Sequence, residues 1–238
     1  MEISNLEIPD AFDFNRMLKI LPKAITRRQF AYFVNNAVRK GELVRIVRGK
    51  YAKKSANPFK IALFLFHGYI GFSSALYLLG LKEEIERVIY VGTSRNSPRV
   101  RFLNKEIVPV NLSALLYGTQ FINGLVVSTY AKTIFDMFYR PKYASFFDLY
   151  RALNRKSLSR EEWKELLHYC TKSNVSTIRR IGYALEGKAP KWFTGALLRI
   201  SDEHGGVSYF MRKGSKGKFS KKWHLYDDID VLRWKNAE

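Results

Sequence analysis

Apolar side chains recur at helical spacing between residues 26 and 41. Together they form one face of a helix: Phe30, Phe33, Val34, Ala37 and Val38. Thr26 followed by Gln29 has the spacing of a capping box, and Gly41 supplies a C-terminal stop. The pattern therefore predicts an amphipathic helix over residues 27–40.

A β-hairpin is predicted directly after this helix. Residues 42–47 and 50–54 have strand character, and Arg48-Gly49 joins them with a basic tip. A short helix is expected before them, over roughly residues 12–20. This order is similar to that of a winged helix-turn-helix, in which one helix enters the major groove and the hairpin acts as the wing. An ordinary solvated helix beside a hairpin stays open as the alternative.

Residues 61–81 contain no Asp, Glu, Lys or Arg and are long enough to cross a bilayer. The run is interrupted at residues 67–71, and Ser73 or Ser74 could cap a new helix that ends at Gly80. Two short buried helices therefore explain the segment better than a membrane span. We expect no association with membranes.

The rest of the chain alternates between strand and helix patterns. Strands are predicted over residues 86–93, 100–102, 106–110 and 124–128. Helices are predicted over residues 130–139, 145–154, 159–172 and 174–186, the third opening on a Ser159–Glu162 capping box. The expected fold is α+β, with a winged helix-turn-helix over 1–54, a mixed α+β C-terminal domain over 55–190, and a basic β-hairpin-like tail over 191–238 packed on that domain. The tail strands are expected at 206–210 and 219–226.

Charge points to a polyanionic partner. Among 238 residues, 41 Lys and Arg face 21 Asp and Glu, which gives a net charge of +20. Residues 1–54 carry +7, 55–137 carry +3, 138–190 carry +6, and 191–238 carry +4. Because neutralised phosphates release counterions, double-stranded DNA is the expected partner. A merely soluble surface is the alternative, although small soluble domains usually carry a charge of roughly 2–8. A hydrophobic content of 47% excludes a disordered chain.

The polar face of the helix at 27–40 carries residue types that read bases. Its members are Arg28, Tyr32, Asn35, Asn36 and Arg39, with Gln29 at the margin. Phosphate contacts are assigned to Arg27, Lys40, Arg45, Arg48 and Lys50. Further DNA contacts are assigned to Arg179 and Arg180 near a helix start, and to Arg212, Lys213, Lys216 and Lys218 in the tail. Solvated surfaces remain the alternative for both of these later groups.

No common catalytic motif is present in the sequence. It lacks the zinc-protease, Cys-x-x-Cys, P-loop and dinucleotide-binding patterns, and its four histidines are widely separated. We expect no catalytic residue, metal or cofactor. Glu186 and Lys188, with Asp136 or Asp148 upstream, leave a magnesium-dependent nuclease open as an alternative, and an RNA-binding module is a second one. A buried acid paired with an Arg is the favoured role of Asp136.

The lone cysteine and the N-terminus bear on cellular location. Cys170 cannot form an internal disulfide, and its expected role is that of a buried thiol. The acidic N-terminus lacks the features of a secretory signal. The expected location is therefore intracellular, in the cytoplasm.

Four segments in order resemble the type IV abortive-infection (AbiE-type) antitoxin family. They are residues 48–51, 69–81, 127–137 and 179–186. The resemblance implies a transcriptional repressor that reads the operator of its own operon through a winged helix. It also implies a C-terminal domain that counters a nucleotidyltransferase toxin without forming a stable complex with it. The oligomeric state, monomer or dimer on DNA, stays open.

Overall fold

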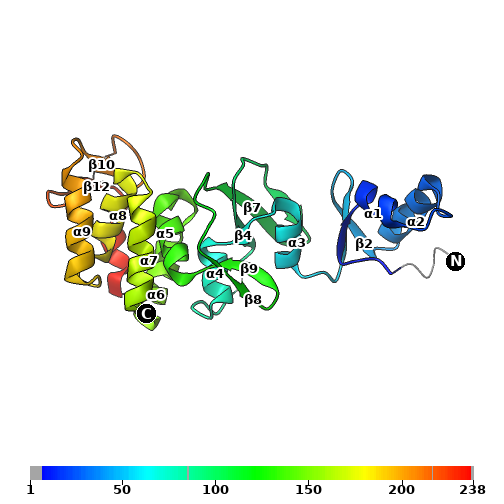
Figure 1. The fold of residues 1–238 in the computed structure, drawn as a ribbon, viewed down its shortest axis with the longest axis horizontal. Helices are drawn as coiled ribbons and strands as arrows, with labels where there is room; N and C mark the ends of the chain where they lie inside the picture. The colour runs from blue at the N-terminus through cyan, green and yellow to red at the C-terminus, as the bar shows by residue number, and fades with distance from the viewer. Residues whose placement is uncertain (1–6, 85, 216, 237–238) are drawn as a thin grey trace. The chain divides into compact units, whose positions relative to one another are not determined.

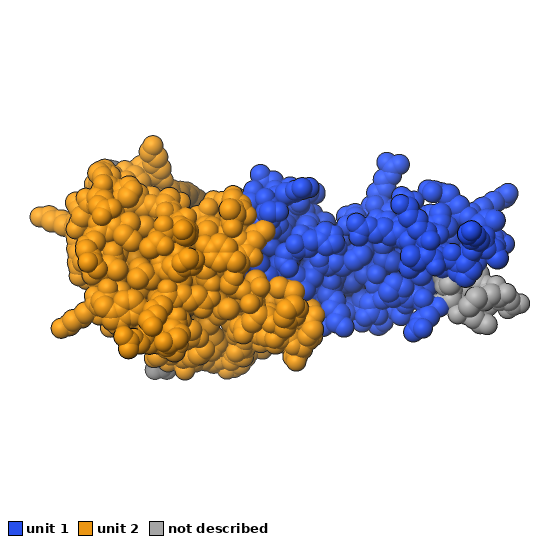
Figure 2. Space-filling view, viewed as in Figure 1, with its two compact units in different colours: residues 1–70, 87–111 blue, residues 71–86, 112–238 orange. Residues whose placement is uncertain are grey.

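Helices and strands are mixed in both parts of the chain (Figure 1). The computed structural model describes residues 7–84, 86–215 and 217–236. These residues form two compact units, which Figure 2 shows in different colours: unit 1 has residues 1–70 and 87–111, and unit 2 has residues 71–86 and 112–238. The units group residues differently from the divisions after residues 54 and 190 that the sequence predicts.

Unit 1 begins with a small module of helices and antiparallel strands. Its elements are β1 (Ala11–Asp13), α1 (Phe14–Ile20), α2 (Arg27–Arg39), β2 (Leu43–Val47) and β3 (Lys50–Lys53). The strands lie in the order β1-β3-β2. The sequence expects helix from about residue 12, but residues 11–13 pair with β3, and the Asp13 carboxylate caps α1 instead. The predicted α2, its capping box and the hairpin after it are confirmed.

A compact aromatic core joins the helices of this module to its sheet. Phe12 and Phe30 are buried, and the ring centroids of Phe14 and Phe30 lie 4.9 Å apart. Val34 from α2 and Leu43 from β2 belong to the same buried cluster. Burial of these side chains fixes which face of α2 packs inward, and therefore which face meets solvent.

The described residues in the remainder of unit 1 form one helix and four strands, which pair both in parallel and antiparallel. It contains α3 (Pro58–Phe66), β4 (Tyr69–Ile70), β5 (Val88–Thr93), β6 (Val100–Phe102) and β7 (Lys105–Asn111). The strand order is β6-β7-β5-β4, with β5 and β7 parallel. The C-cap of α3 is His67, whose φ of 49° is left-handed. A Cβ at Gly68 would lie 1.9 Å from the Gly92 carbonyl oxygen, so the turn needs a glycine.

The apolar run at 61–81 is divided as the sequence predicts. After α3 and β4 comes a separate helix, α4 (Phe72–Leu78). Its N-cap is Gly71, without a side-chain hydrogen bond, so the expected cap at Ser73 or Ser74 is wrong. Both serines are buried inside the helix, where the Ser73 hydroxyl donates to the Glu86 carboxylate. Within the segments that the structure describes, no helix combines the length and the apolar character of a membrane span.

Unit 2 is mainly helical. Besides α4 it contains β8 (Thr119–Ile122), β9 (Leu125–Ser128), α5 (Tyr130–Tyr139), a 3-10 turn (Pro141–Tyr143), α6 (Phe146–Arg155), α7 (Arg160–Thr171), α8 (Val175–Leu185) and α9 (Lys191–Asp202). The predicted α5 to α8 are confirmed, including the Ser159–Glu162 capping box. Asp136 is the buried acid that the sequence favours, but its partner is Lys132 rather than an Arg.

The C-terminal segment differs most from the sequence-based expectation. It starts with α9 and continues as β10 (Ser208–Tyr209), β11 (Lys218–Ser220), β12 (Leu225–Asp227) and a 3-10 helix (Val231–Asn236). β10 pairs with β12 in parallel, so the connection that begins at Met211 is a crossover rather than a hairpin tip. The antiparallel pair is β11 with β12. Trp223, just before β12, is fully buried against Gly182 of α8 and anchors the segment to the helices.

Candidate nucleic-acid interface

A cleft opens between α2, the start of α1 and the β2–β3 turn in unit 1. Its volume is about 540 Å³. Three arginines line it: Arg27 from α2, Arg45 from β2 and Arg48 from the turn. The carboxylate in the lining, Asp13, accepts hydrogen bonds from the backbone N–H groups of Asn15 and Arg16, each at 3.0 Å. The cleft is basic, because three arginines outnumber the one carboxylate among its lining residues.

Local contacts position the chain segments that carry the arginines. Phe14 N donates to the Gly49 carbonyl at 2.7 Å, which ties the turn to the first residue of α1. Gly49 has a φ of 78°, a conformation that glycine adopts readily. The Arg27 guanidinium lies 5.5 Å from the Phe14 ring centroid and 3.4 Å from Asn15 Oδ1. Phe14 and Asn15, at the start of α1, thus contact both the β2–β3 turn and Arg27 of α2.

The outer face of α2 carries most of the predicted base readers. Arg28, Tyr32, Asn35 and Arg39 are exposed, and Asn35 also lines the cleft. Tyr32 is 66% exposed, which is high for an aromatic side chain and leaves its ring available to a partner. Asn36 is half-buried, and its Oδ1 accepts a hydrogen bond from Arg39.

Gln29 has a different role from the one predicted for it as a DNA contact. Its Oε1 accepts from the Thr26 backbone N–H at 2.9 Å and from the Thr26 hydroxyl at 2.8 Å. The side-chain acceptor is therefore used to cap α2, and reading adenine with both amide atoms would break the cap.

The predicted phosphate-binding cations fall into two groups. Lys40 at the end of α2, Arg45 and Arg48 are exposed, whereas Lys50 is half-buried with its Nζ 5.3 Å from the Phe64 ring centroid. Neither the Arg45 nor the Arg48 guanidinium has a hydrogen-bond or ion-pair partner within residues 7–84, 86–215 and 217–236. Arg45 and Arg48 are better placed for a phosphate than Lys50.

Arg179 and Arg180 are not available to DNA, contrary to the prediction. Arg179 is 1% exposed; its guanidinium donates to Ser201 Oγ at 3.0 Å, the Gly206 carbonyl at 2.9 Å and the His204 carbonyl at 2.6 Å. Arg180 donates to the Tyr209 carbonyl, and burial lowers the pKa of Arg180 to about 10. Both arginines fasten α8 to the C-terminal segment. The sequence shows their place near a helix start but not these distant carbonyls.

The tail cations lie in unit 2. Arg212 and Lys213 in the crossover and Lys218 in β11 are exposed, and Lys216 lies outside the described residues. The Asp228 carboxylate accepts from the backbone N–H groups of Met211 and Arg212, at 2.8 and 2.9 Å. These contacts hold the start of the crossover and leave the cationic side chains in solvent.

The carboxylates of the nuclease alternative are engaged by three different cations. Glu186 pairs with Lys222 and accepts from Trp223 Nε1 at 3.0 Å, Asp136 pairs with Lys132, and Asp148 pairs with Lys82 at 2.6 Å. Burial opposes ionisation of Glu186, but the hydrogen bonds from Lys222 and Trp223 outweigh it and lower the pKa of the carboxyl. Among residues that the structure places, no group of three or more His, Cys, Asp and Glu could hold a metal ion.

Cys170 is buried, as the sequence predicts. Burial raises the pKa of its thiol, so the thiolate is disfavoured at neutral pH.

Comparison with known proteins shows a fold and no family. No family model matches the chain, and no curated protein matches its sequence. The crystal structure of the RV2827C protein from Mycobacterium tuberculosis is similar, with a TM-score of 0.62 and 16% sequence identity. The match covers 94% of this chain and 89% of that chain. At this level of identity, it shows that the two chains share a mixed α+β fold.

Proposed function

We propose that the chain is a DNA-binding transcriptional regulator whose N-terminal module, residues 11–53, is a winged helix. The observation that carries the proposal is the arginine-lined cleft, where α2 and the β2–β3 turn present cations on adjoining surfaces. α2 has the length, the cap and the polar outer face of a recognition helix. The β2–β3 turn is the candidate wing.

The residue roles follow from exposure and geometry. Arg28, Tyr32 and Asn35 are the proposed base readers, since they project from α2 without a structural task. Arg27, Arg45 and Arg48 are the proposed phosphate contacts. Asn36 and Arg39 contact each other and can act as one donor group at the end of the helix.

The charge distribution supports a polyanionic partner for unit 1. Residues 1–70 and 87–111 carry 18 of the 41 Lys and Arg but only 6 of the 21 Asp and Glu. Their net charge is +12 of the total of +20. Phosphate neutralisation by such a surface supplies affinity for any sequence, so selectivity must come from the polar side chains of α2.

The resemblance to abortive-infection antitoxins suggests which DNA is bound. In this proposal the chain represses its own operon and opposes a nucleotidyltransferase toxin encoded beside it, without a stable complex between the two proteins. A nucleotidyltransferase reading frame next to this gene would support the antitoxin role. A gene neighbourhood without one would contradict that role and leave a general regulator.

Selection from a random duplex library with the full chain tests the proposal. We expect an enriched motif. We also expect a gel shift with the DNA upstream of the protein's own gene, and a scrambled duplex should compete poorly for binding. Recovery of no motif would contradict sequence-specific regulation. Stronger competition by single-stranded RNA than by duplex would favour the RNA-binding alternative. Magnesium-dependent cutting of the DNA, abolished by Glu186→Gln, would favour the nuclease.

A further inference from the structure

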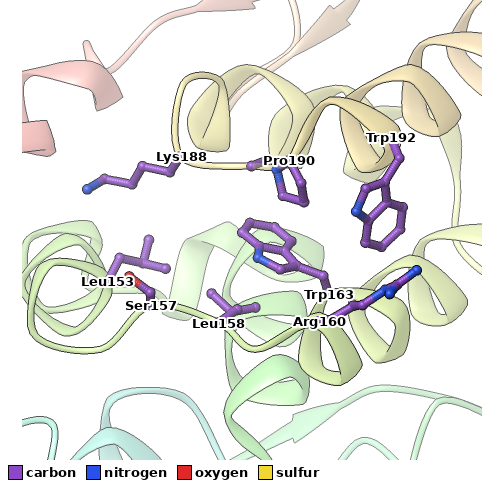
Figure 3. A pocket seen from close by; sticks show the side chains of 9 residues that line it. Leu153, Ser157, Leu158, Arg160, Trp163, Lys188, Pro190 and Trp192 are labelled. Carbon is purple, nitrogen blue, oxygen red and sulfur yellow. The ribbon is translucent and has the colours of Figure 1, made fainter.

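A second cleft lies in unit 2, where α7 and α9 begin (Figure 3). Its volume is about 540 Å³, which is within the range of small-molecule sites. It shares no residue with the arginine-lined cleft of unit 1. Of its lining residues, Lys188 belongs to the nuclease alternative, and Trp192 lies on α9, which the sequence does not predict.

Two tryptophans give this cleft an aromatic wall. In Figure 3 the indole of Trp163 lies below the Pro190 ring and the indole of Trp192 lies to its right; all three residues line the cleft. Trp163 is 7% exposed and is held by Phe193, with ring centroids 4.8 Å apart. Trp192 is 43% exposed, so a large part of its ring is uncovered. One indole is thus fixed by packing and the other offers a free face.

The polar part of the lining is cationic. Arg160 and Lys188 line the cleft, and no carboxylate does so among the residues assigned to it. Lys188 Nζ donates to Asn154 Oδ1 at 2.6 Å, a neutral partner that orients the ammonium without cancelling its charge. The nearby Glu162 is occupied by Lys156 and by the cap of α7. The cleft therefore favours an anion.

We propose that this cleft binds a nucleotide. The base stacks on Trp192, and the phosphate is held by Arg160. In Figure 3 Lys188 lies at the opposite end of the cleft from Arg160 and Trp192, where it adds positive charge without sharing the same phosphate. Aromatic faces next to cations are the combination that binds bases with their phosphates, because every base has a π-face and guanidinium groups pair with phosphate oxygens. A free nucleotide and a nucleotide within a single strand present the same chemistry. The inference does not rest on the proposed DNA binding by unit 1.

Calorimetric titration of the full chain tests this site, with tryptophan fluorescence as a second signal. The titrants are the four ribonucleoside triphosphates, inorganic triphosphate and a short single-stranded oligonucleotide. We expect binding of at least one base-containing titrant, weakened about tenfold by Trp192→Ala and by Arg160→Gln. Lys191→Gln is the matched control, since Lys191 is exposed at the start of α9 but does not line the cleft. Its affinity should equal that of the wild type.

The two titrant classes distinguish the source of the nucleotide. Tighter binding of a free triphosphate identifies a mononucleotide ligand, and binding of the oligonucleotide alone identifies a single strand. Inorganic triphosphate binding as tightly as every nucleotide would overturn the proposal, as would an absence of binding up to about 1 mM. Equal affinity of the wild type and a folded Trp192→Ala or Arg160→Gln variant would also overturn it. Circular dichroism establishes folding of each variant.

Discussion

Two arginines with the same predicted role have opposite environments in this protein. Arg179 is enclosed by carbonyl and hydroxyl oxygens from the Ser201–Ser208 region, whereas Arg48 is exposed at a turn. Sequence position could not separate them, because the acceptors of Arg179 are more than twenty residues away in the chain. The predicted exposure of Arg28, Asn35 and Arg48 needed only the helical period and a turn, both of which are local.

Arg179→Ala should destabilise unit 2 without changing the proposed DNA contact. Removing the guanidinium leaves the buried Ser201 carbonyl and the part-buried Gly206 and His204 carbonyls without their donor, at a cost of about 3 kcal/mol in the free energy of unfolding. Denaturant titration measures the loss, with the exposed Lys172→Ala as control. A loss no larger than that of the control would contradict the structural role.

Arg48→Ala and Asn35→Ala should have different effects on DNA binding. Loss of a phosphate contact weakens binding to every duplex and makes the slope of log K against log salt shallower by about 0.9. Loss of a base reader changes preference at one position of the motif, by about 1–3 kcal/mol. Fluorescence anisotropy on matched and mismatched duplexes distinguishes the two, and the exposed Lys60→Ala on α3 is the control. Identical profiles for both variants would contradict these roles.

Acid stability should depend on Glu162. Burial raises its pKa, but hydrogen bonds from Lys156 and from Ser159 outweigh burial, so the net pKa is below the usual 4.5. A carboxyl with a lowered folded pKa stabilises the fold above 4.5, and this contribution is lost as the pH falls through the folded pKa. The free energy of unfolding measured from about pH 6 to about pH 3 should fall less steeply in Glu162→Gln than in the wild type. Parallel curves would show that Glu162 does not contribute.

At the scale of elements, helices marked by local sequence signals were predicted correctly, whereas the pairing of strands that are distant in the sequence was not predicted. α2 and α7 were predicted because each carries its capping box and apolar period within a few residues. In the C-terminal segment, parallel pairing of β10 with β12 depends on contacts made by Trp223 and Leu225 in the folded chain. The apolar spacing of Phe193 and Leu197 was the available signal for α9, but the basic run that follows favoured a hairpin.

Gly182→Ala tests how the C-terminal segment is fastened to α8. In an open helix this change would stabilise by about 1 kcal/mol, but here the new Cβ would lie 2.1 Å from the ring of the buried Trp223. We therefore expect net destabilisation, and near-ultraviolet dichroism should show a displaced tryptophan. Gly195→Ala in α9 is the matched control, since nothing lies within 4 Å of its Cβ, and it should stabilise. Stabilisation by both changes would contradict the packing of Trp223.

At the scale of the whole molecule, the chain leaves unit 1 and returns to it. Residues 87–111 belong with 1–70, because β5 pairs with β4 and carries β7 beside it. Sequence composition could not reveal this return, since the partners in β4 and β5 are about twenty residues apart and both are apolar. The predicted α+β class is correct, because it depends only on which kinds of element occur. The uneven distribution of charge is also seen at this scale, since unit 1 carries +12 of the net +20.

The central claim is that the exposed arginines of the N-terminal module bind duplex DNA. The most direct measurement is the salt dependence of duplex affinity, for the wild type and for a variant combining Arg27→Gln, Arg45→Gln and Arg48→Gln. We predict that the wild type binds and that the variant loses affinity with a slope shallower by about 2 to 3. The same affinity and slope in a folded variant would contradict the account.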